Sequence, residues 1–355
     1  MSKRVTISDV ARSAGVSATA VSFAFNHPDE LNPQTVERIL ETARDLGYAP
    51  SPFARALLRR RAGVIGVLVP QPLPAILENP FFPMFLAGVA TTCHAHDLSM
   101  LVTGAPDSTT LGDPIARAPV DGFIVVGVDE DHHEVQPLQR RGVPFVLVDG
   151  EAQTASSLNI DDEGGAYSAL SYLLGRGHRD IVILTFETPY AHLDDVLHGA
   201  GGGRRHGFMR AAHEAGVPWR EDWFVPCITS IAGGEQAFRA LWTAGARPTA
   251  IQSVSDVVAI GAIRAAQRVG VRVPEDLEVI GFDDIPLASL VTPTLSTVRQ
   301  PVFERGALAA EMLVRELGDS QPGERVQLPT ELVLRDSTRG SMASLPKSGE
   351  PPGPS

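Results

Sequence analysis

Cysteine is scarce in this sequence of 355 residues, where only Cys93 and Cys227 occur, far apart along the chain. Two cysteines so placed provide neither the disulfide framework of a small secreted domain nor the ligand spacing of a zinc site. Long apolar runs are missing too: the start, MSKRVTISDV, lacks the apolar stretch of a secretion signal, and no later run could span a membrane. We therefore expect a cytoplasmic protein.

An excess of positive charge is also lacking. The chain has 30 lysine and arginine residues against 42 aspartate and glutamate residues, a net charge of −12, which taken alone argues against a nucleic-acid partner. The distribution is uneven, because residues 1–62 hold nine basic and six acidic residues, a net +3, which leaves −15 for the rest. A basic head on an acidic body is typical of a DNA-binding protein whose body stays away from the phosphates.

Residues 6–26, TISDVARSAGVSATAVSFAFN, predict two short helices around a tight turn. Thr6 and Asp9 have the spacing of a capping box, and Gly15 follows the first apolar stripe at the position where helices commonly end. Ser17 can cap a second helix. The inner face of that helix would carry Ala20, Val21, Ala24 and Phe25. This pattern predicts a helix-turn-helix, whose second helix enters the DNA major groove; an ordinary helical hairpin is the alternative.

A third helix and a short basic segment follow. Asn32 is a good cap, Pro33 suits the first helical position, and Gly47 marks the end of the helix. Residues 51–62 could begin a helix at Ser51-Pro52, but about ten residues are too few for a stable helix in water. The segment is therefore either a plain linker or a hinge that folds only on DNA, with arginines near phosphates and an apolar wedge in the minor groove.

From Gly63 onward, short runs rich in Val, Ile and Leu alternate with helical patterns, which predicts an α/β core of two doubly wound parallel-sheet subdomains. The expected strands are GVIGVLVP, LSMLVTG, DGFIVVGV and PFVLVDG, then DIVILTF, TAIQSVS, LEVIGFDD and a late ELVLR. The expected helices lie near 81–96, 107–118, 131–141, 163–176, 204–215, 234–244, 256–269 and 300–317.

The expected domain organisation follows from these patterns. Residues 1–50 form an all-α headpiece, 51–62 a hinge or linker, and 63–339 the core. The first subdomain takes about 63–160 plus crossing segments at 299–325, and the second takes about 161–298 plus 326–339. Residues 340–355, rich in Pro and Gly, should be a disordered tail without a heptad pattern for tetramerisation.

Several motifs in collinear order closely resemble the LacI/GalR family of bacterial transcription regulators. These are residues 6–26, ERILETARDLGYAPSPFARAL, IGVLVP, NPFF, DGFIVVG, GHRDIVIL, PEDLEVIGFDDIPLA and TPTLSTVRQP, which together cover about residues 5–339. The resemblance implies a helix-turn-helix headpiece, a hinge helix, and a periplasmic-binding-protein-like core. It further implies a small effector, bound between the subdomains, and a homodimer on pseudo-palindromic operator DNA, most simply as a repressor.

The resemblance also implies where DNA is contacted. The base-contacting positions of the second helix fall on Ala18, Thr19 and Phe23, and Leu57 falls on the leucine that enters the minor groove. The whole DNA-binding set is Thr6, Ser17, Ala18, Thr19, Ser22, Phe23, Asn26, Arg55 and Leu57. Phe23 departs from the family, which usually has an arginine suited to guanine; a phenyl ring offers only apolar contact, for instance with a thymine methyl. Alternatively, Phe23 packs back on the headpiece.

In the effector cleft, the resemblance maps onto Arg204, Ser255, Asp283 and Gln300, with Phe81 and Phe82 as an apolar wall. This set suits a sugar or similar polyhydroxyl ligand, because carboxylates accept hydroxyl hydrogens, arginine donates to oxygens, and an aromatic face covers C–H groups. Ser255 departs from the family's usual asparagine, so the identity of the ligand cannot be copied from a relative. Asp283 could instead cap a following helix. For Asp161 and Asp162, cap or hinge roles are favoured over ligand contact.

Other features do not support an enzyme, a cofactor or a metal. The stretch HGAGGGR at 198–204 lacks the third glycine of a dinucleotide-binding loop, and we expect a flexible loop there. The histidines lack metal-ligand spacing, and no nucleophile motif occurs. A solute-binding protein would need a secretion signal and no headpiece, and an enzyme would need a catalytic set. The sequence leaves open the effector, the operator, and whether the effector acts as inducer or corepressor.

Overall fold

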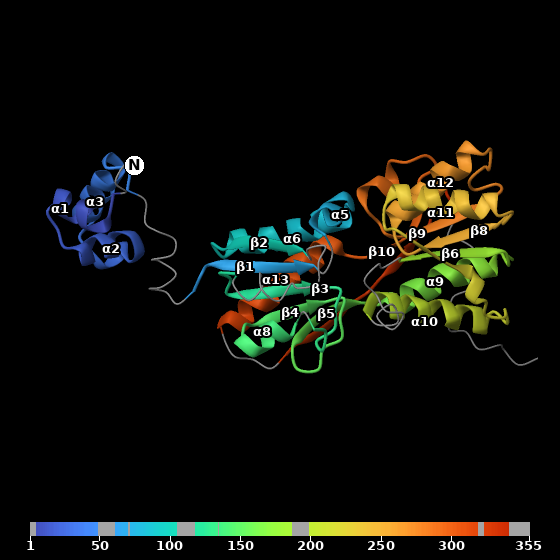
Figure 1. The fold of residues 1–355 in the computed structure, drawn as a ribbon, viewed down its shortest axis with the longest axis horizontal. Helices are drawn as coiled ribbons and strands as arrows, with labels where there is room; N and C mark the ends of the chain where they lie inside the picture. Colours follow the sequence, from blue (N-terminus) through green and yellow to red (C-terminus); the bar gives the residue numbers. More distant parts are fainter. Residues whose placement is uncertain are drawn as a thin grey trace, which may run out of the picture. The chain divides into compact units, whose positions relative to one another are not determined.

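The computed structural model describes residues 5–48, 61–69, 72–104, 118–133, 135–186, 199–318 and 323–340. The hinge positions Arg55 and Leu57, the expected tail, and nearly all of the helix expected near 107–118 lie outside these ranges. The chain divides into two compact units, Met1–Gly63 and Val64–Ser355 (Figure 1).

The first unit is the predicted three-helix headpiece. It consists of α1 (Ile7–Ala14), α2 (Ala18–Asn26), the 3₁₀ helix η1 (Pro28–Glu30) and α3 (Pro33–Asp45). One small hydrophobic core joins the three α-helices, and it contains Val10, Ala11, Ala14, Val21, Ala24, Ile39 and Ala43. The helical spacing of these apolar residues is thus confirmed.

Local hydrogen bonds set the ends of the headpiece helices. The Asp9 carboxylate accepts from the Thr6 backbone N–H at 3.0 Å and from its hydroxyl at 2.7 Å. The Ser17 hydroxyl accepts from the Ala20 N–H at 3.0 Å. Gly15 takes the left-handed conformation, with φ of 66°, that allows α1 to end in a tight turn. The predicted caps of all three helices are present, because the Asn32 side chain likewise caps α3.

The first sheet of the core has the order β11-β5-β4-β3-β1-β2, and its strand pairs are parallel. Its strands are β1 (Val64–Val69), β2 (Ser99–Gly104), β3 (Gly122–Val126), β4 (Phe145–Val148), β5 (Ser156–Ile160) and β11 (Arg325–Leu328). Helices α6 (Phe81–Ala95) and α13 (Val302–Gly318) share a hydrophobic cluster with this sheet, and the short α5 (Leu73–Glu78) precedes α6. The short helix α8 (Gln136–Arg141) packs through a separate cluster.

The second sheet has the order β12-β10-β9-β8-β6-β7, with β12 antiparallel to β10. Its strands are β6 (Ile181–Phe186), β7 (Phe224–Cys227), β8 (Ala250–Ser253), β9 (Glu278–Asp283), β10 (Ser296–Arg299) and β12 (Glu331–Val333). Helices α9 (Asp162–Gly175) and α10 (Gly199–Glu214) cover one face, and α11 (Ile231–Thr243) and α12 (Asp256–Arg268) cover the other (Figure 1). Two short 3₁₀ helices, η3 (Glu221–Trp223) and η4 (Pro286–Ser289), complete the described elements. The prediction of two doubly wound subdomains is confirmed.

Two details of the expected organisation are wrong. The strand β11 pairs with β5 in the first sheet, so the chain returns to the second subdomain after Leu328 rather than at 325–326. Residues 199–203 are helical rather than a flexible loop, because α10 begins at Gly199. The strands β7, β10 and β11 were not predicted, since their four-residue sequences are too short to show a clear strand pattern.

Close packing explains why glycines occur in α10. A Cβ atom on Gly207 would lie 2.2 Å from the carbonyl oxygen of Glu163 in α9, and one on Gly203 would lie 3.0 Å from the Asp162 side chain. The glycines therefore let α10 approach α9 closely and bring Arg204 beside Asp162.

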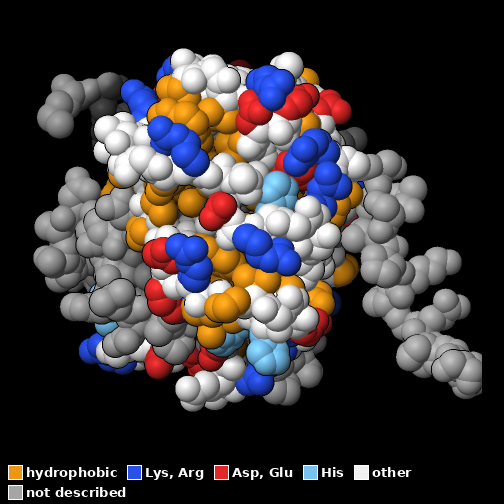
Figure 2. All heavy atoms as spheres, turned by 90° about the vertical axis from the view of Figure 1, so that its right-hand side faces the viewer, with side chains coloured by type: hydrophobic (Ala, Val, Ile, Leu, Met, Phe, Trp, Pro, Cys, Tyr) orange, Lys and Arg blue, Asp and Glu red, His pale blue; other side chains and the backbone are white. Residues whose placement is uncertain are grey.

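Charges of both signs lie close together on the core surface. On the face shown in Figure 2, basic side chains are interspersed with acidic and apolar ones. The exposed ion pair Arg272–Asp276, at 2.5 Å, is one of several such pairs. Within the described ranges, no helix is long and apolar enough to cross a membrane.

Candidate functional site

The outward side of α2 carries most of the predicted DNA-contacting residues. Val21 and Ala24 are buried in the headpiece core, whereas Ala18 and Thr19 are exposed and Ser22 and Phe23 are half-buried. Exposed Thr6 and Ser17 stand at the starts of α1 and α2. Helix starts favour phosphate oxygens, because their backbone N–H groups point outward. The structure thus presents these side chains on the surface of the headpiece; the Asn26 side chain, Arg55 and Leu57 lie outside what it describes.

The Phe23 ring does not join the hydrophobic core that Phe25 contacts. Its centroid lies 5.6 Å from that of His27, at the exposed end of α2. Phe25, two residues on, packs on the core and edge-on against Tyr48 at 5.9 Å. The arrangement favours Phe23 as a surface residue over Phe23 as part of the headpiece core.

The positive charge of the headpiece comes from its flanks. Residues 5–48 contain three arginines and six carboxylates, a net charge of −3. The remaining basic residues of segment 1–62 are Lys3, Arg4, Arg55, Arg59, Arg60 and Arg61. The excess of positive charge expected for phosphate contacts thus lies in the sequence on either side of residues 5–48 rather than within them.

The predicted effector residues gather where strands of the core end. Asp283 is the last residue of β9, Ser255 lies two residues after β8, and Gln300 directly follows β10. Asp149, which was not predicted, follows β4 of the first sheet. The carboxyl ends of parallel strands are where doubly wound sheets bind ligands, so the topology brings these groups to a suitable place.

Arg204 is buried and held on three sides. Its Nε donates to the Asp162 carboxylate at 2.7 Å and its Nη1 to the Val254 carbonyl at 2.5 Å. The guanidinium lies 3.6 Å from the centroid of the Phe282 ring, a cation–π contact. Burial raises the pKa of Asp162 to about 6 despite the neighbouring guanidinium. Asp162 is therefore the partner of Arg204, whereas Asp161 caps α9 as expected, accepting from the Gly164 N–H at 2.9 Å.

Asp283 is almost fully buried and has a strained backbone, with φ of 121°. The Gln300 side-chain amide donates to its carboxylate at 2.5 Å. Burial raises the pKa of Asp283 to about 7. Asp283 does not cap a following helix, because the 3₁₀ helix η4 is preceded by Ile285 as its cap residue.

A chain of contacts continues from Asp283 across the core. The side-chain amide oxygen of Gln300, Oε1, accepts from the Arg305 guanidinium, which also donates to the Asp149 carboxylate. This relay of Asp149, Arg305, Gln300 and Asp283 connects the end of β4 in the first sheet with the end of β9 in the second. Arg305 and Asp149 were missed because single charged residues beside apolar runs carry no signal for long-range pairing.

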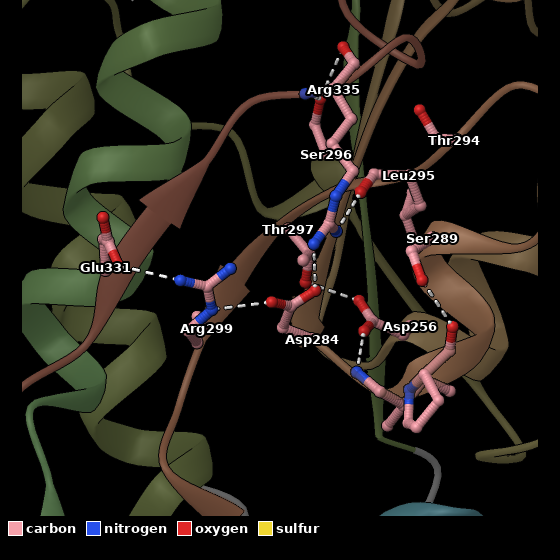
Figure 3. Close-up of polar contacts among 12 residues, drawn as sticks. Asp256, Asp284, Ser289, Thr294, Leu295, Ser296, Thr297, Arg299, Glu331 and Arg335 are labelled. Atoms are coloured by element: carbon pink, nitrogen blue, oxygen red, sulfur yellow. Dashed lines mark hydrogen bonds and ion pairs between the residues drawn. The ribbon is translucent and has the colours of Figure 1, made fainter.

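Asp256, at the start of α12, anchors the loop after β9. Its carboxylate accepts from the Thr297 hydroxyl at 2.5 Å and from the Ile285 N–H at 2.9 Å (Figure 3). Burial raises the pKa of Asp256 well above its ordinary value. The neighbouring Ser255 hydroxyl is buried and has no hydrogen-bond partner among the described residues. Position 255, where this chain departs from the family's usual asparagine, thus carries a buried hydroxyl that no described residue satisfies.

Ion pairs of Asp284 and Arg299 also hold the loop after β9. Asp284 accepts from Arg299 at 2.7 Å and from Arg335 at 2.6 Å, and Arg299 also meets Glu331 at 3.2 Å (Figure 3). These contacts tie the strand β10 to the late segment that contains β12. The loop that carries Asp283 and Asp284 is therefore fixed from both ends.

The two predicted wall residues begin α6. Phe81 is buried, and its ring meets Phe82 edge-on with centroids 5.2 Å apart. The Arg305 guanidinium lies 5.9 Å from the Phe81 ring centroid, which places Phe81 beside the relay. Two cavities of the described residues lie elsewhere: one of about 770 Å³ along α11 and one of about 350 Å³ beside Glu130. Among the candidate effector residues, Gln300 contacts Asp283 and Phe81 contacts Phe82.

We expect the core to become more stable as the pH falls from 8 to 5. Asp162 and Asp283 have pKa values of about 6 and about 7 in the folded chain, against about 3.9 when unfolded. A raised carboxyl pKa means that the folded state binds protons more tightly, so this stability is full below pH 4 and is lost as the pH rises through 6 and 7. The gain should be roughly 4 kcal/mol, measured by urea unfolding. Asp283→Asn should remove most of it; an unchanged pH dependence in that variant would contradict the assignment.

Glu278 is buried too, but it should not contribute to the change in stability between pH 5 and pH 8. Burial alone would raise its pKa, but contacts with His178, Arg339 and Arg176 lower the pKa to about 2. Its contribution to stability is therefore lost only below about pH 4.5 and stays constant between pH 5 and 8.

Comparison with known proteins agrees with both parts of the structure. Residues 6–51 match the family model of bacterial regulatory proteins of the lacI family, and residues 170–338 match the periplasmic binding protein-like domain. Catabolite control protein A of Priestia megaterium is 31% identical over 344 residues, covering 94% of this chain and 99% of that protein.

Solved structures show the same fold. The transcriptional regulator CelR in complex with cellobiose has a TM-score of 0.70 at 27% identity, covering 94% of this chain and all of that one. The lac repressor dimer bound to operator and an anti-inducer has a TM-score of 0.81 at 24% identity, covering 95% and 100%. Within the described residues, no group of His, Cys, Asp and Glu side chains could hold a metal ion. The chain belongs to the lacI family of bacterial regulatory proteins, which are DNA-binding transcription regulators rather than enzymes.

Proposed function

We propose that this protein is a ligand-responsive, sequence-specific transcription regulator, most simply a repressor, that acts in the cytoplasm. The main observation is that a headpiece with an outward-facing second helix precedes a separate core in which buried polar side chains gather at strand ends. The partner of the headpiece is double-stranded operator DNA. Its pseudo-palindromic form follows if the chain binds as a homodimer, since a two-fold axis repeats each half-site.

The DNA-binding residues are those named from the family resemblance. Ala18, Thr19 and Phe23 contact base edges in the major groove, supported by their positions on the outward side of α2. Thr6, Ser17, Ser22 and Asn26 contact or position the phosphates, and Arg55 and Leu57 belong to the hinge. Leu57 would insert between base steps, which bends the duplex, while Arg55 neutralises phosphate.

The effector is a sugar or a similar polyhydroxyl metabolite that binds between the two subdomains. Asp283 would accept hydroxyl hydrogens, Arg204 and Gln300 would donate to oxygens, Ser255 would do either, and Phe81 and Phe82 would cover an apolar side. The buried Ser255 hydroxyl without a partner supports this assignment. The relative CelR was solved with cellobiose, a molecule of this class.

Ligand binding can reach the DNA because the effector residues belong to both subdomains. A ligand that prefers one arrangement of the subdomains shifts their population, and with it the spacing of the two hinges in a dimer. A coupling of about 1–3 kcal/mol would change operator affinity by about five- to 150-fold. Both an inducer and a corepressor fit this scheme, and they differ in which arrangement the ligand prefers.

The test uses the full-length protein and two steps. Selection from random duplexes should yield a pseudo-palindromic site, and a thermal-shift screen with sugars, sugar phosphates and nucleobases should yield a ligand that raises the melting temperature. Adding that ligand to the selected complex should change the operator affinity at least about five-fold, in either direction. Binding to all duplexes alike, or an affinity that no stabilising ligand changes, would contradict the proposal.

Replacing Phe23 by arginine should change the preferred base in each half-site toward guanine. An arginine can donate two hydrogen bonds to the guanine edge, whereas phenylalanine offers only apolar contact, and discrimination of about 1–3 kcal/mol per base pair follows. The spacing of the half-sites should not change. The measurement is a second duplex selection with Phe23→Arg; His27→Arg, one turn away on an exposed position, is the control for added charge. The same base preference in all three proteins would show that Phe23 does not contact bases.

A further inference from the structure

Arg305 is the largest fully buried side chain of the described core, with an exposed fraction of 0%. Complete burial of an arginine is rare, because its charge must leave water and its N–H groups then need partners. The residue also sits in the first turns of α13, where the helix dipole disfavours a positive charge. A purely apolar side chain would pack there at lower cost, so the charge needs another explanation.

The hydrogen-bonding capacity of Arg305 is only partly used. One terminal nitrogen donates to the side-chain amide oxygen of Gln300 and the other to the Asp149 carboxylate. The Nε atom is buried and has no partner among the described residues. Guanidinium groups carry more N–H donors than these two contacts require. A bound molecule that offers oxygen acceptors at this point would satisfy donors that the protein leaves unpaired.

The charges around Arg305 indicate whether a neutral or an anionic ligand can bind beside it. The Arg305–Asp149 and Arg204–Asp162 pairs are each neutral as units. Within the described part of the chain, the hydrogen bonds to the Asp283 and Asp256 carboxylates come only from neutral groups. The cleft therefore holds more carboxylates than guanidinium groups, and both arginines are already paired. A buried anionic ligand would find no unpaired guanidinium group among the described cleft residues to balance its charge.

We propose that Arg305 is a specificity-determining residue of the effector cleft that donates hydrogen bonds to hydroxyl oxygens of a neutral polyhydroxyl ligand. This inference rests on the proposed function and deepens it, because it assigns a further contact and excludes a class of ligands. Neutral hydroxyl groups can accept from Arg305 and at the same time donate to Asp149 or Asp283. Phosphorylated and carboxylated sugars are rejected, since Arg204 and Arg305 are already paired with Asp162 and Asp149 and cannot balance a further negative charge.

The experiment is calorimetry with the full-length protein and matched probes. The neutral set is cellobiose, glucose and ribose, and the anionic set is glucose 6-phosphate, ribose 5-phosphate and glucuronate. At least one neutral probe should bind, and its anionic counterpart should bind at least about ten-fold more weakly. Arg305→Met should weaken binding of the neutral probe by about ten- to 100-fold, as expected for the loss of hydrogen bonds to a charged group.

Two further variants keep the test decisive. Arg315→Met removes an exposed arginine on the same helix as Arg305, whose partner Glu324 lies outside that helix, and should bind the probe as the parent does. Arg305→Lys keeps the charge beside Asp149 but lacks the planar fork, so it should fold and still bind about ten-fold more weakly. If Arg305→Met does not fold, Arg305→Lys alone decides the contact.

The outcomes distinguish the role of Arg305 from the proposed function of the protein. Parent-like binding by a folded Arg305→Met or Arg305→Lys protein would overturn the role of Arg305, while leaving the proposed function intact. Tighter binding of an anionic probe than of its neutral counterpart would overturn the exclusion of anions. The absence of binding by every probe of both sets would overturn this inference together with a sugar-like effector.

Discussion

Removal of residues 1–63 should abolish specific operator binding, lowering the affinity by at least about 1000-fold, the usual gap between specific and non-specific binding. The reason is that every predicted base contact and most of the local positive charge lie in this segment, whereas the rest of the chain carries a net negative charge. The cut follows the boundary between the two compact units, after Gly63. The measurement is titration of the selected duplex with the full chain and with residues 64–355.

The remaining core should keep its other properties. It retains its own hydrophobic clusters and both complete sheets, so it should unfold cooperatively and respond to the same ligand as the full chain. The melting temperature with and without that ligand is the control for folding. A core fragment that still prefers the operator over a scrambled duplex would show that the DNA-binding surface was assigned to the wrong part of the protein.

Replacing Arg204 by alanine should destabilise the core by about 3–5 kcal/mol at pH 8, the range expected when one partner of a buried ion pair is removed. Arg204 and Asp162 are both buried, and the variant would leave the Asp162 carboxylate without its guanidinium partner. The loss should be smaller at pH 5, since Asp162 can then fold in its neutral form. Urea unfolding at the two pH values measures both effects.

The chain offers a closely matched control for this variant. Arg210 lies on the same helix as Arg204 and pairs with Glu163, the neighbour of Asp162, but the side chains of Arg210 and Glu163 are both more than two-fifths exposed. Arg210→Ala should therefore cost no more than about 1 kcal/mol at either pH. If Arg204→Ala were as mild as Arg210→Ala, the Arg204–Asp162 contact would not be the anchor of the cleft that the structure suggests.

The combined variant Arg204→Ala with Asp162→Asn tests whether the unpaired Asp162 carboxylate causes the loss of stability. Removing both charges avoids an unpaired buried carboxylate, so the double variant should be more stable at pH 8 than Arg204→Ala alone. Additive losses would mean that the two residues act independently.

The headpiece helices and the central strands of the core could be predicted from the sequence, because the signals that define them are local. The capping box of Thr6 and Asp9, the left-handed Gly15 and the caps at Ser17 and Asn32 involve residues within a few positions of each other. Continuous apolar runs likewise predicted the central strands β1, β3, β4, β6, β8 and β9, since buried parallel strands need apolar residues on both faces. The family resemblance then indicated which positions face DNA and ligand.

Only the tertiary structure decided the partners of the charged residues in the core. Arg204 meets Asp162 from 42 positions away, and Arg305 meets Asp149 from 156 positions away. For the same reason the sequence did not predict β11, which joins the first sheet through its pairing with β5. It also did not explain the glycines of α10, which allow this helix to lie close to α9. Such contacts depend on strand order and helix packing, which bring distant segments together, and no local pattern of residues records them.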